Sequence, residues 1–210
     1  MENPANCQLL NKPIVAAFDF DGTMTKHDSL YDFFKYSAGS LQTYLIFLQH
    51  LPKFIGFALK IFPRIELKES LLKSFFEGMP IADLRLKGEA FAKNIIPTLV
   101  KKDALAKLKW HQSQGHHCIL VSANMDFYLD FFTKNNQFND CLCTKTAFDE
   151  AGLVTGKLQG KNCRDVEKVR RLTELLGSKE NYTLYAYGDS EGDKELLALA
   201  DYPFYRVFHK

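Results

Sequence analysis

The sequence predicts an α/β protein with a Rossmann-like, mostly parallel sheet into which an all-helical segment is inserted. Short apolar runs of strand length alternate with amphipathic helical patterns, which is typical of strands joined by helical crossovers. Several of these runs end in carboxylates or a hydroxyl, as expected at the ligand-binding edge of such a sheet. Strand signals are missing between residues 28 and 93, which predicts the helical insertion.

Composition is that of a globular chain and excludes one class of partner. The 210 residues are 46% hydrophobic, which is enough to bury a sizeable core. The formal net charge is only +2, so charge gives no case for nucleic-acid binding.

The cysteines indicate a reducing compartment. Their number, five, is odd and they follow no secretory signal, so we expect reduced thiols in a cytoplasmic protein. Cys141-x-Cys143 could be half of a zinc site, but the sequence offers no second ligand pair at the usual spacing. Residues 1–12 are polar and are expected to form a flexible tail. The five cysteines are Cys7, Cys118, Cys141, Cys143 and Cys163.

The first predicted strand, within residues 14–23, carries the most informative motif. Its apolar run ends in Asp19 and Asp21, which would share one side of the sheet if the strand continued that far. Gly22 then breaks the strand and lets backbone approach a ligand. Asp-Gly also marks ordinary turns, so the motif alone leaves exposed turn acids as an equal alternative. Two carboxylates at a strand end suit an aspartate nucleophile for phosphoryl transfer, with a metal ion to offset their charge.

The inserted segment begins with a helical pattern over residues 28–36. Asp28 or Ser29 is a plausible N-cap, and capping is favoured for Asp28 over the alternative that it reaches a ligand. Two further helical patterns, at residues 64–76 and 81–93, are divided by a Gly-Met-Pro turn.

Residues 41–62 are the unusual part of the insertion. On a helix their polar side chains fall in one narrow stripe, and the rest is apolar. At about 1.5 Å per residue the segment could cross a membrane. Lys53, Lys60 and Pro52 argue against a spanning helix. We expect a kinked pair of amphipathic helices, either buried in a helical cap or lying on a membrane surface.

The remainder of the chain alternates between the two kinds of element. Strands are expected within residues 117–123, 141–146, 152–160, 183–187 and 203–208. Helices are expected at residues 98–114, 127–134, 165–176 and 196–200. Residues 13–27 and 95–210 would then form the α/β core, and residues 28–94 the helical cap.

Polar side chains follow three of the predicted strands. If these strands are parallel, their polar ends gather at one edge of the sheet. Four carboxylates there would repel one another without a cation, and an oxygen-only ligand set favours Mg²⁺. The side chains are Asp19, Asp21, Ser122, Asp189 and Asp193.

Cationic and hydrogen-bonding groups could complete this site. Lys168, on the predicted helix 165–176, could neutralise Asp19 and a phosphate. Ser122 and the backbone N–H groups near Asp21 and Gly22 could hold phosphate oxygens.

Taken in order, these motifs resemble the haloacid dehalogenase superfamily. The resemblance is to its phosphoserine-phosphatase-like branch, subfamily IB, in which a helical C1 cap is inserted between the first and second motifs. It covers nearly the whole chain after the first dozen residues, and four motifs in order are highly specific. The motifs are Asp19-Phe20-Asp21-Gly22-Thr23, Val121-Ser122-Ala123, Lys168, and Gly188-Asp189 followed by Asp193.

The resemblance implies a role for each motif residue. Asp19 would be the nucleophile that forms an aspartyl-phosphate, and Asp21 would protonate the leaving oxygen and then activate water. Ser122 and Lys168 would bind the phosphoryl group. Mg²⁺ would lie between Asp19, the backbone carbonyl of Asp21, and Asp189. Supporting positions would be Asp193, Gly22, Thr23 and Ala123.

Two further residues are candidates for substrate binding. Lys161 is the rival for the lysine role, but its place in a Gly-Lys-Asn loop makes it the weaker candidate. Phosphoserine phosphatases of this branch carry a Glu roughly where Asp28 stands. The shorter Asp leaves phosphoserine unfavoured as the substrate.

The resemblance implies a Mg²⁺-dependent phosphomonoester hydrolase that acts on a small phosphorylated metabolite in the cytoplasm. A second hypothesis keeps this chemistry on a lipid, because residues 41–62 resemble in position the hydrophobic cap of bacterial phosphatidylglycerophosphate phosphatases. The protein would then contact the inner face of the membrane weakly, whereas a homodimer through the cap would cover the same apolar surface. A non-catalytic binding module of the same fold ranks last, since every expected catalytic side chain is present.

Overall fold

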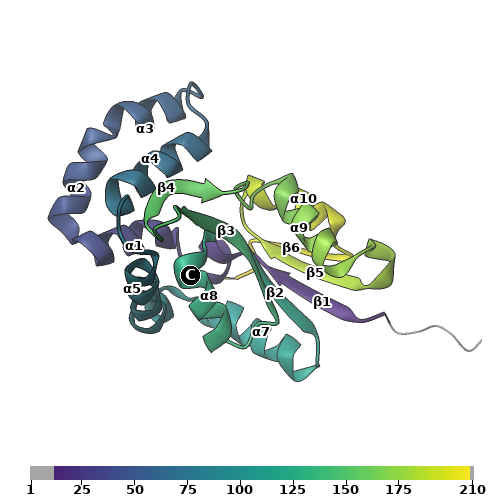
Figure 1. The fold of residues 1–210 in the computed structure, drawn as a ribbon. Coiled ribbons are helices and arrows are strands. Elements are labelled where there is room, and N and C mark those ends of the chain that lie inside the picture. The colour runs from purple at the N-terminus through teal and green to yellow at the C-terminus, as the bar shows by residue number, and fades with distance from the viewer. Residues whose placement is uncertain (1–11, 209–210) are drawn as a thin grey trace, which may run out of the picture.

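The computed structural model describes residues 12–208 and contains a six-stranded sheet with the order β4-β3-β2-β1-β5-β6 (Figure 1). Neighbouring strands run parallel except β3 and β4, which are antiparallel. The predicted α/β fold with a mostly parallel sheet is therefore confirmed. The strands are β1 (Ile14–Phe18), β2 (His117–Met125), β3 (Asp140–Phe148), β4 (Val154–Gln159), β5 (Thr183–Gly188) and β6 (Tyr202–Tyr205).

Helices cover both faces of this sheet. The central strand β1 is accordingly buried on both sides. Ala16 and Phe18 pack into the core beneath α7 and α8, whereas Val15 and Ala17 pack into a separate core beneath α9 and α10. The covering helices are α7 (Lys102–Ser113), α8 (Asp126–Asn135), α9 (Val166–Leu176) and α10 (Lys194–Leu199).

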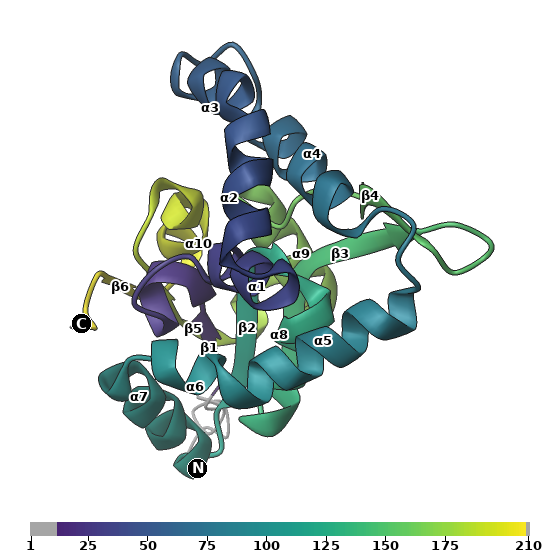
Figure 2. The same cartoon turned by 90° about the vertical axis from the view of Figure 1, so that its left-hand side faces the viewer.

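Of the helices between β1 and β2, the first five form a layer beside the sheet (Figures 1 and 2). We call them the helical insertion. Its base is an aromatic core in which Phe33 of α1 contacts Phe76, Phe91 and, from α8, Phe127. The helices are α1 (Ser29–Ala38), α2 (Ser40–Gln49), α3 (Leu51–Ala58), α4 (Arg64–Phe76) and α5 (Ile81–Asn94).

Helices α2 and α3 form the outermost part of the insertion (Figure 2). The predicted kinked pair is confirmed: α2 ends at Gln49, and α3 begins at Leu51 with Pro52 in its first turn. Within residues 12–208, no helix is long and apolar enough to span a bilayer. The two helices and the turn after them expose a set of large apolar side chains, which we call the α2–α3 apolar face. Its members are Leu41, Tyr44, Leu45, Leu48, Leu51, Ile55, Leu59 and Ile61.

One predicted helix is wrong in its extent. The pattern at residues 98–114 is split into α6 (Ile96–Leu99) and α7, with extended backbone at Val100 and Lys101 between them. The break has a tertiary cause. Val100 bridges to Thr25, and the N–H of Lys101 donates to the carbonyl of Met24 at 2.8 Å. The predicted final strand, residues 203–208, is also shorter, since β6 ends at Tyr205.

The predicted flexible tail, residues 1–12, lies outside the described residues except for its last residue. Cys7 lies outside them as well. The other four cysteines are free thiols, as predicted: Cys118, Cys141, Cys143 and Cys163.

Candidate active site

A cleft of about 850 Å³ lies at the C-terminal ends of β1, β2 and β5. The sequence-predicted residues from all three strand ends line it together, because these strands are parallel neighbours in the sheet. They are Asp19, Asp21, Ser122, Asp189 and Asp193, joined by Lys168 from α9.

The turn after β1 separates the two carboxylates that the sequence predicted to share one side. β1 stops at Phe18, and residues Phe20–Met24 form a π-helical turn in which Gly22 has φ = 79°. A side chain at Gly22 would overlap the Asp189 carboxylate, so both the backbone conformation and the close approach require glycine. The condition for a shared side, a strand that continues to Asp21, is therefore not met: both carboxylates line the cleft, but Asp19 faces Lys168, whereas Asp21 faces Ser29 and Asn124.

A buried lysine joins two of the carboxylates. The Lys168 ammonium is 2.6 Å from Asp19 Oδ1 and 2.6 Å from Asp193 Oδ1. Burial alone would lower the pKa of Lys168, but the two carboxylates outweigh it and raise that pKa, so the lysine is charged. The other oxygen of Asp193 accepts from the backbone N–H and the hydroxyl of Ser190. Burial raises the pKa of Asp193, but Lys168 and these bonds outweigh it, and the net shift is downward.

The carboxylate cluster fits a hard cation. One oxygen each from Asp19, Asp189 and Asp193 lies within 4.8 Å of the others. Burial, reinforced by Asp193, raises the pKa of Asp19 to about 6 despite Lys168, and burial with Asp193 also raises the pKa of Asp189. Closely spaced carboxylate oxygens form the ligand set that Mg²⁺ prefers. Both oxygens of Asp193 are engaged, one by Lys168 and the other by Ser190, whereas Lys168 engages only Oδ1 of Asp19. Asp19 and Asp189 are therefore the side chains better placed to bind a metal.

Asp21 lies in a different environment from Asp19. Its Oδ1 accepts from the backbone N–H of Ser29 at 2.8 Å and from the Ser29 hydroxyl at 2.7 Å, and its Oδ2 accepts from the side-chain amide of Asn124. Burial, followed by the charge of Asp28, raises the pKa of Asp21 to about 8 in spite of these bonds. A carboxyl that is protonated near neutral pH can donate a proton.

Hydrogen-bonding groups line the remaining wall of the cleft. Ser122 is buried where the pairing of β2 with β3 becomes irregular, and its hydroxyl accepts from the Asn124 N–H at 3.0 Å. Ala123 follows it in the cleft lining, and Thr23 is buried beside Asp189.

Several cleft residues were missed by sequence reasoning. Lys101 donates to the carbonyl of Gly22, and Arg206 donates to the carbonyl of Asp189 at 2.8 Å. Arg64 and Arg164 line the same cleft. Lys101 lies in the break of a helix that the sequence predicted to be continuous, and the arginines belong to no motif, so no local pattern marks them.

The two substrate-binding candidates have different positions. Asp28 caps α1 by accepting from the N–H of Leu30 at 2.9 Å, as predicted, and it also lines the cleft. Lys161 is exposed and is not part of the cleft lining. The lysine beside Asp19 is Lys168.

A second pocket of about 250 Å³ adjoins the cleft between the helical insertion and the sheet, and Asp21, Asp28, Arg64 and Ala123 line both. Its other walls are apolar side chains of the insertion together with a lysine and two asparagines. They are Leu30, Phe54, Phe57, Leu67 and Leu71, with Lys68, Asn124 and Asn162.

Comparison with known proteins places the chain among hydrolases. The sequence profile described as haloacid dehalogenase-like hydrolase matches residues 16–198. Protein CicA of Caulobacter vibrioides is 33% identical over 207 residues, which are 98% of this chain and 91% of that protein.

Solved structures share the fold. A protein with unknown function from Bordetella pertussis Tohama I superposes with a TM-score of 0.74 and 21% identity, over 90% of this chain and 87% of that one. A phospho-aspartyl intermediate analogue of phosphoserine phosphatase gives a TM-score of 0.60 and 15% identity, over 90% and 84%. A phosphoserine phosphohydrolase-like protein from Francisella tularensis gives 0.62 and 16%, over 91% and 85%.

Proposed function

The chain belongs to the haloacid dehalogenase-like hydrolase family, and from that premise we propose that it is a Mg²⁺-dependent phosphomonoester phosphatase. The observation that carries the proposal is the division of labour between two neighbouring aspartates. Asp19 is buried against the Lys168 ammonium, whereas Asp21 is held by the neutral groups of Ser29 and Asn124. One carboxylate is thus placed as a nucleophile and the other as an acid and base.

The reaction would proceed in two steps. Asp19 attacks phosphorus, the bond from phosphorus to the leaving oxygen breaks, and Asp21 gives its proton to that oxygen. Water then attacks the aspartyl-phosphate while Asp21 takes its proton, which releases inorganic phosphate and restores Asp19. Ser122 and Lys168 hold the phosphoryl oxygens. When bound, Mg²⁺ would be held by Asp19, Asp189 and the Asp21 backbone carbonyl, and it would supply positive charge against the repulsion between two anions.

We assign the helical insertion the role of a C1 cap, which would put the chain in subfamily IB. Its five helices lie between β1 and β2, and α3 and α4 line the pocket that adjoins the cleft. This supports a cap of residues 28–94 on a core of residues 13–27 and 95–210. The cap would choose the substrate, and a small phosphorylated metabolite is the first candidate.

A lipid phosphomonoester is the second candidate, and one observation favours it. Phe54 and Phe57 of α3 line the pocket beside the cleft, whereas Leu51 and Ile55 of the same helix are about half exposed, at 48% and 52%. One helix thus presents apolar side chains both to solvent and to the substrate pocket. A protein that rests on a membrane by the α2–α3 apolar face could bind an acyl chain along this route.

A substrate panel tests the proposal. Purified protein is assayed with soluble phosphomonoesters and with lipid phosphomonoesters in detergent, in Mg²⁺ and in chelator, beside Asp19→Asn. We expect Mg²⁺-dependent phosphate release that falls at least about 10³-fold in the variant, since the nucleophile is removed and its shape is kept. Beryllium fluoride should inhibit the wild type competitively.

The panel also separates the candidates. Release from lipids alone would favour the membrane hypothesis, and release from soluble compounds alone would remove it. Binding without release by the wild type would leave the non-catalytic module, and strong activity in Asp19→Asn would overturn the nucleophile assignment.

A further inference from the structure

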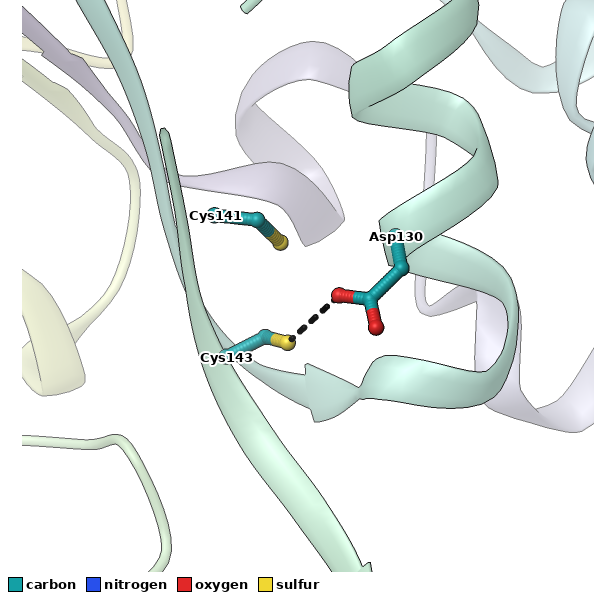
Figure 3. Close-up of side chains that lie close together, drawn as sticks. All are labelled: Asp130, Cys141 and Cys143. Carbon is teal, nitrogen blue, oxygen red and sulfur yellow. Dashed lines mark hydrogen bonds between the residues drawn. The ribbon is translucent and has the colours of Figure 1, made fainter. Parts of the chain in front are cut away.

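A second group of metal-ligating side chains lies away from the cleft, where α8 packs on β3 (Figure 3). Cys141 and Cys143 are two residues apart on β3, so the alternation of the strand places both on the face covered by α8. Asp130 projects from α8 toward them. One ligand atom from each of the three lies within 4.8 Å of the others, and Cys143 Sγ is 3.9 Å from Asp130 Oδ1.

Asp130 supplies the additional ligand that the sequence alone did not offer. Cys141-x-Cys143 has no second pair at the usual zinc-site spacing, but the fold brings a carboxylate to it from a different element. Two sulfurs and one carboxylate oxygen are donors that suit Zn²⁺, whereas thiol donors disfavour Mg²⁺ and Ca²⁺. The cluster is therefore chemically distinct from the oxygen-only cluster of the cleft.

Charge and access are also consistent with an ion. Two thiolates and a carboxylate carry three negative charges, which a dication and one ammonium would balance. That ammonium is present: Lys145, two residues after Cys143 on the same strand, lies 3.3 Å from Asp130 Oδ1. Cys143 is buried, whereas Cys141 and Asp130 are partly exposed. An ion can reach the group from solvent and can keep water as a fourth ligand.

We propose that Asp130, Cys141 and Cys143 form a binding site for a thiophilic metal ion, with Zn²⁺ as the expected occupant. The ion would tie α8 to β3. Tyr128, one half-turn before Asp130 on α8, hydrogen-bonds through its hydroxyl to Ser29 at 3.1 Å, and Ser29 holds Asp21. An ion at this place would stiffen the helix that supports the proposed catalytic acid.

Cobalt provides a spectroscopic test that does not depend on activity. The full-length protein, reduced with a phosphine, is titrated with Co²⁺ and then with Zn²⁺. We expect a near-ultraviolet sulfur-to-cobalt charge-transfer band that saturates at one equivalent and is bleached by Zn²⁺. Cys141→Ser should remove about half of its intensity, and Asp130→Asn should weaken Co²⁺ affinity about tenfold or more.

Matched variants separate this site from others. Cys163→Ser removes a buried thiol on the opposite face of the sheet, and Asp189→Ala alters the cleft, so both should keep the band. Cys143 is buried, so the partly exposed Cys141 is the decisive position. Zn²⁺ should raise the melting temperature of the wild type more than that of Cys141→Ser, which keeps only two of the three ligands. Absence of the band in the wild type, or a band unchanged in Cys141→Ser, would overturn the proposal.

Discussion

The cleft and the outer pair of insertion helices are opposite kinds of surface. In the cleft, Lys168 and Asp193 are almost completely buried, and each is fixed by charged or hydrogen-bonding partners. On the α2–α3 apolar face, Leu41 and Leu59 are 74% and 65% exposed. The first arrangement is costly to disturb, because removing one partner of a buried ion pair costs about 3–5 kcal/mol. The second costs little to change within the monomer.

The difference indicates where each part of the function is specified. Buried charges that balance one another allow few substitutions, so they fix the chemistry of the reaction. The side chains of an exposed apolar face contribute little to the stability of the monomer, so their identity can be determined by what the face binds. We therefore expect substitutions in the cleft to change catalysis and metal binding, and substitutions on the α2–α3 apolar face to change association alone.

After loss of the nucleophile Asp19, the largest effect should come from Asp189, the proposed metal ligand. Asp189→Ala removes one of the two carboxylates better placed to bind a cation, and we expect Mg²⁺ affinity to fall about 100-fold or more. Ser122→Ala removes the hydroxyl that we propose binds phosphate in the same cleft, and it should leave Mg²⁺ affinity within about threefold. Calorimetric titration with Mg²⁺ measures both. Equal losses in the two variants would show that Asp189 is not a ligand.

A smaller effect on kcat is expected for Ser29, which contacts the proposed catalytic acid Asp21 but does not line the cleft. Ser29→Ala removes the hydroxyl that donates to Asp21, and we expect kcat to fall about 10-fold to 100-fold, less than the 10²–10⁴-fold that a general acid contributes. KM should stay within about threefold, because Ser29 is not in the cleft lining.

Ser37→Ala is the matched control for this change. It removes another hydroxyl of α1, which donates to the Phe33 carbonyl and does not contact Asp21. A merely structural role for Ser29 would lower stability and leave the pH profile of kcat unchanged, so a shifted profile identifies the positioning role.

These residues show how far the sequence could predict the site. Asp19 and Asp189 follow the ends of β1 and β5, Ser122 lies near the C-terminal end of β2, and the parallel sheet alone brings them to one cleft. Ser29 and Asn124 carry no comparable signal. They became partners of Asp21 only because the π-helical turn at Gly22 redirects that carboxylate. The sequence predicted that the strand breaks at Gly22, but it did not predict the path of the backbone after the break.

The strands of the fold were predicted better than the points at which helices break. Alternating apolar runs predicted all six strands, because burial on one or both faces leaves a local pattern. The break before α7 depends on a hydrogen bond from Lys101 to Met24, and the approach of Asp130 to Cys141 and Cys143 depends on the packing of α8 (Figure 3). Contacts of this kind join residues that are far apart in the chain. The sequence around each of these residues has no pattern from which the contact could be predicted.

The smallest effect on the stability of the monomer is expected for substitutions on the α2–α3 apolar face. These substitutions also test the comparison of this face with the cleft most directly. Leu48 and Ile55 are about half exposed, so replacing both with Gln should change the free energy of unfolding by about 0.5 kcal/mol or less and leave turnover of soluble substrates unchanged. Val166→Gln, on α9, is the control for an exposed apolar side chain elsewhere.

Flotation with anionic vesicles and light scattering measure what the same change does to association. Eight large apolar side chains exposed on adjoining helices and the turn after them are typical of an interaction surface. With only Lys53 and Lys60 on the two helices and the turn after them, attraction to anionic lipid should be modest and salt-sensitive. We therefore expect a dimer through this face in preference to strong vesicle binding, and either should be lost in the double variant and kept in Val166→Gln. If the wild type is a monomer that does not bind vesicles, the support for a lipid substrate is removed. The α2–α3 apolar face would then have no role in association, and only the cleft would have a proposed function.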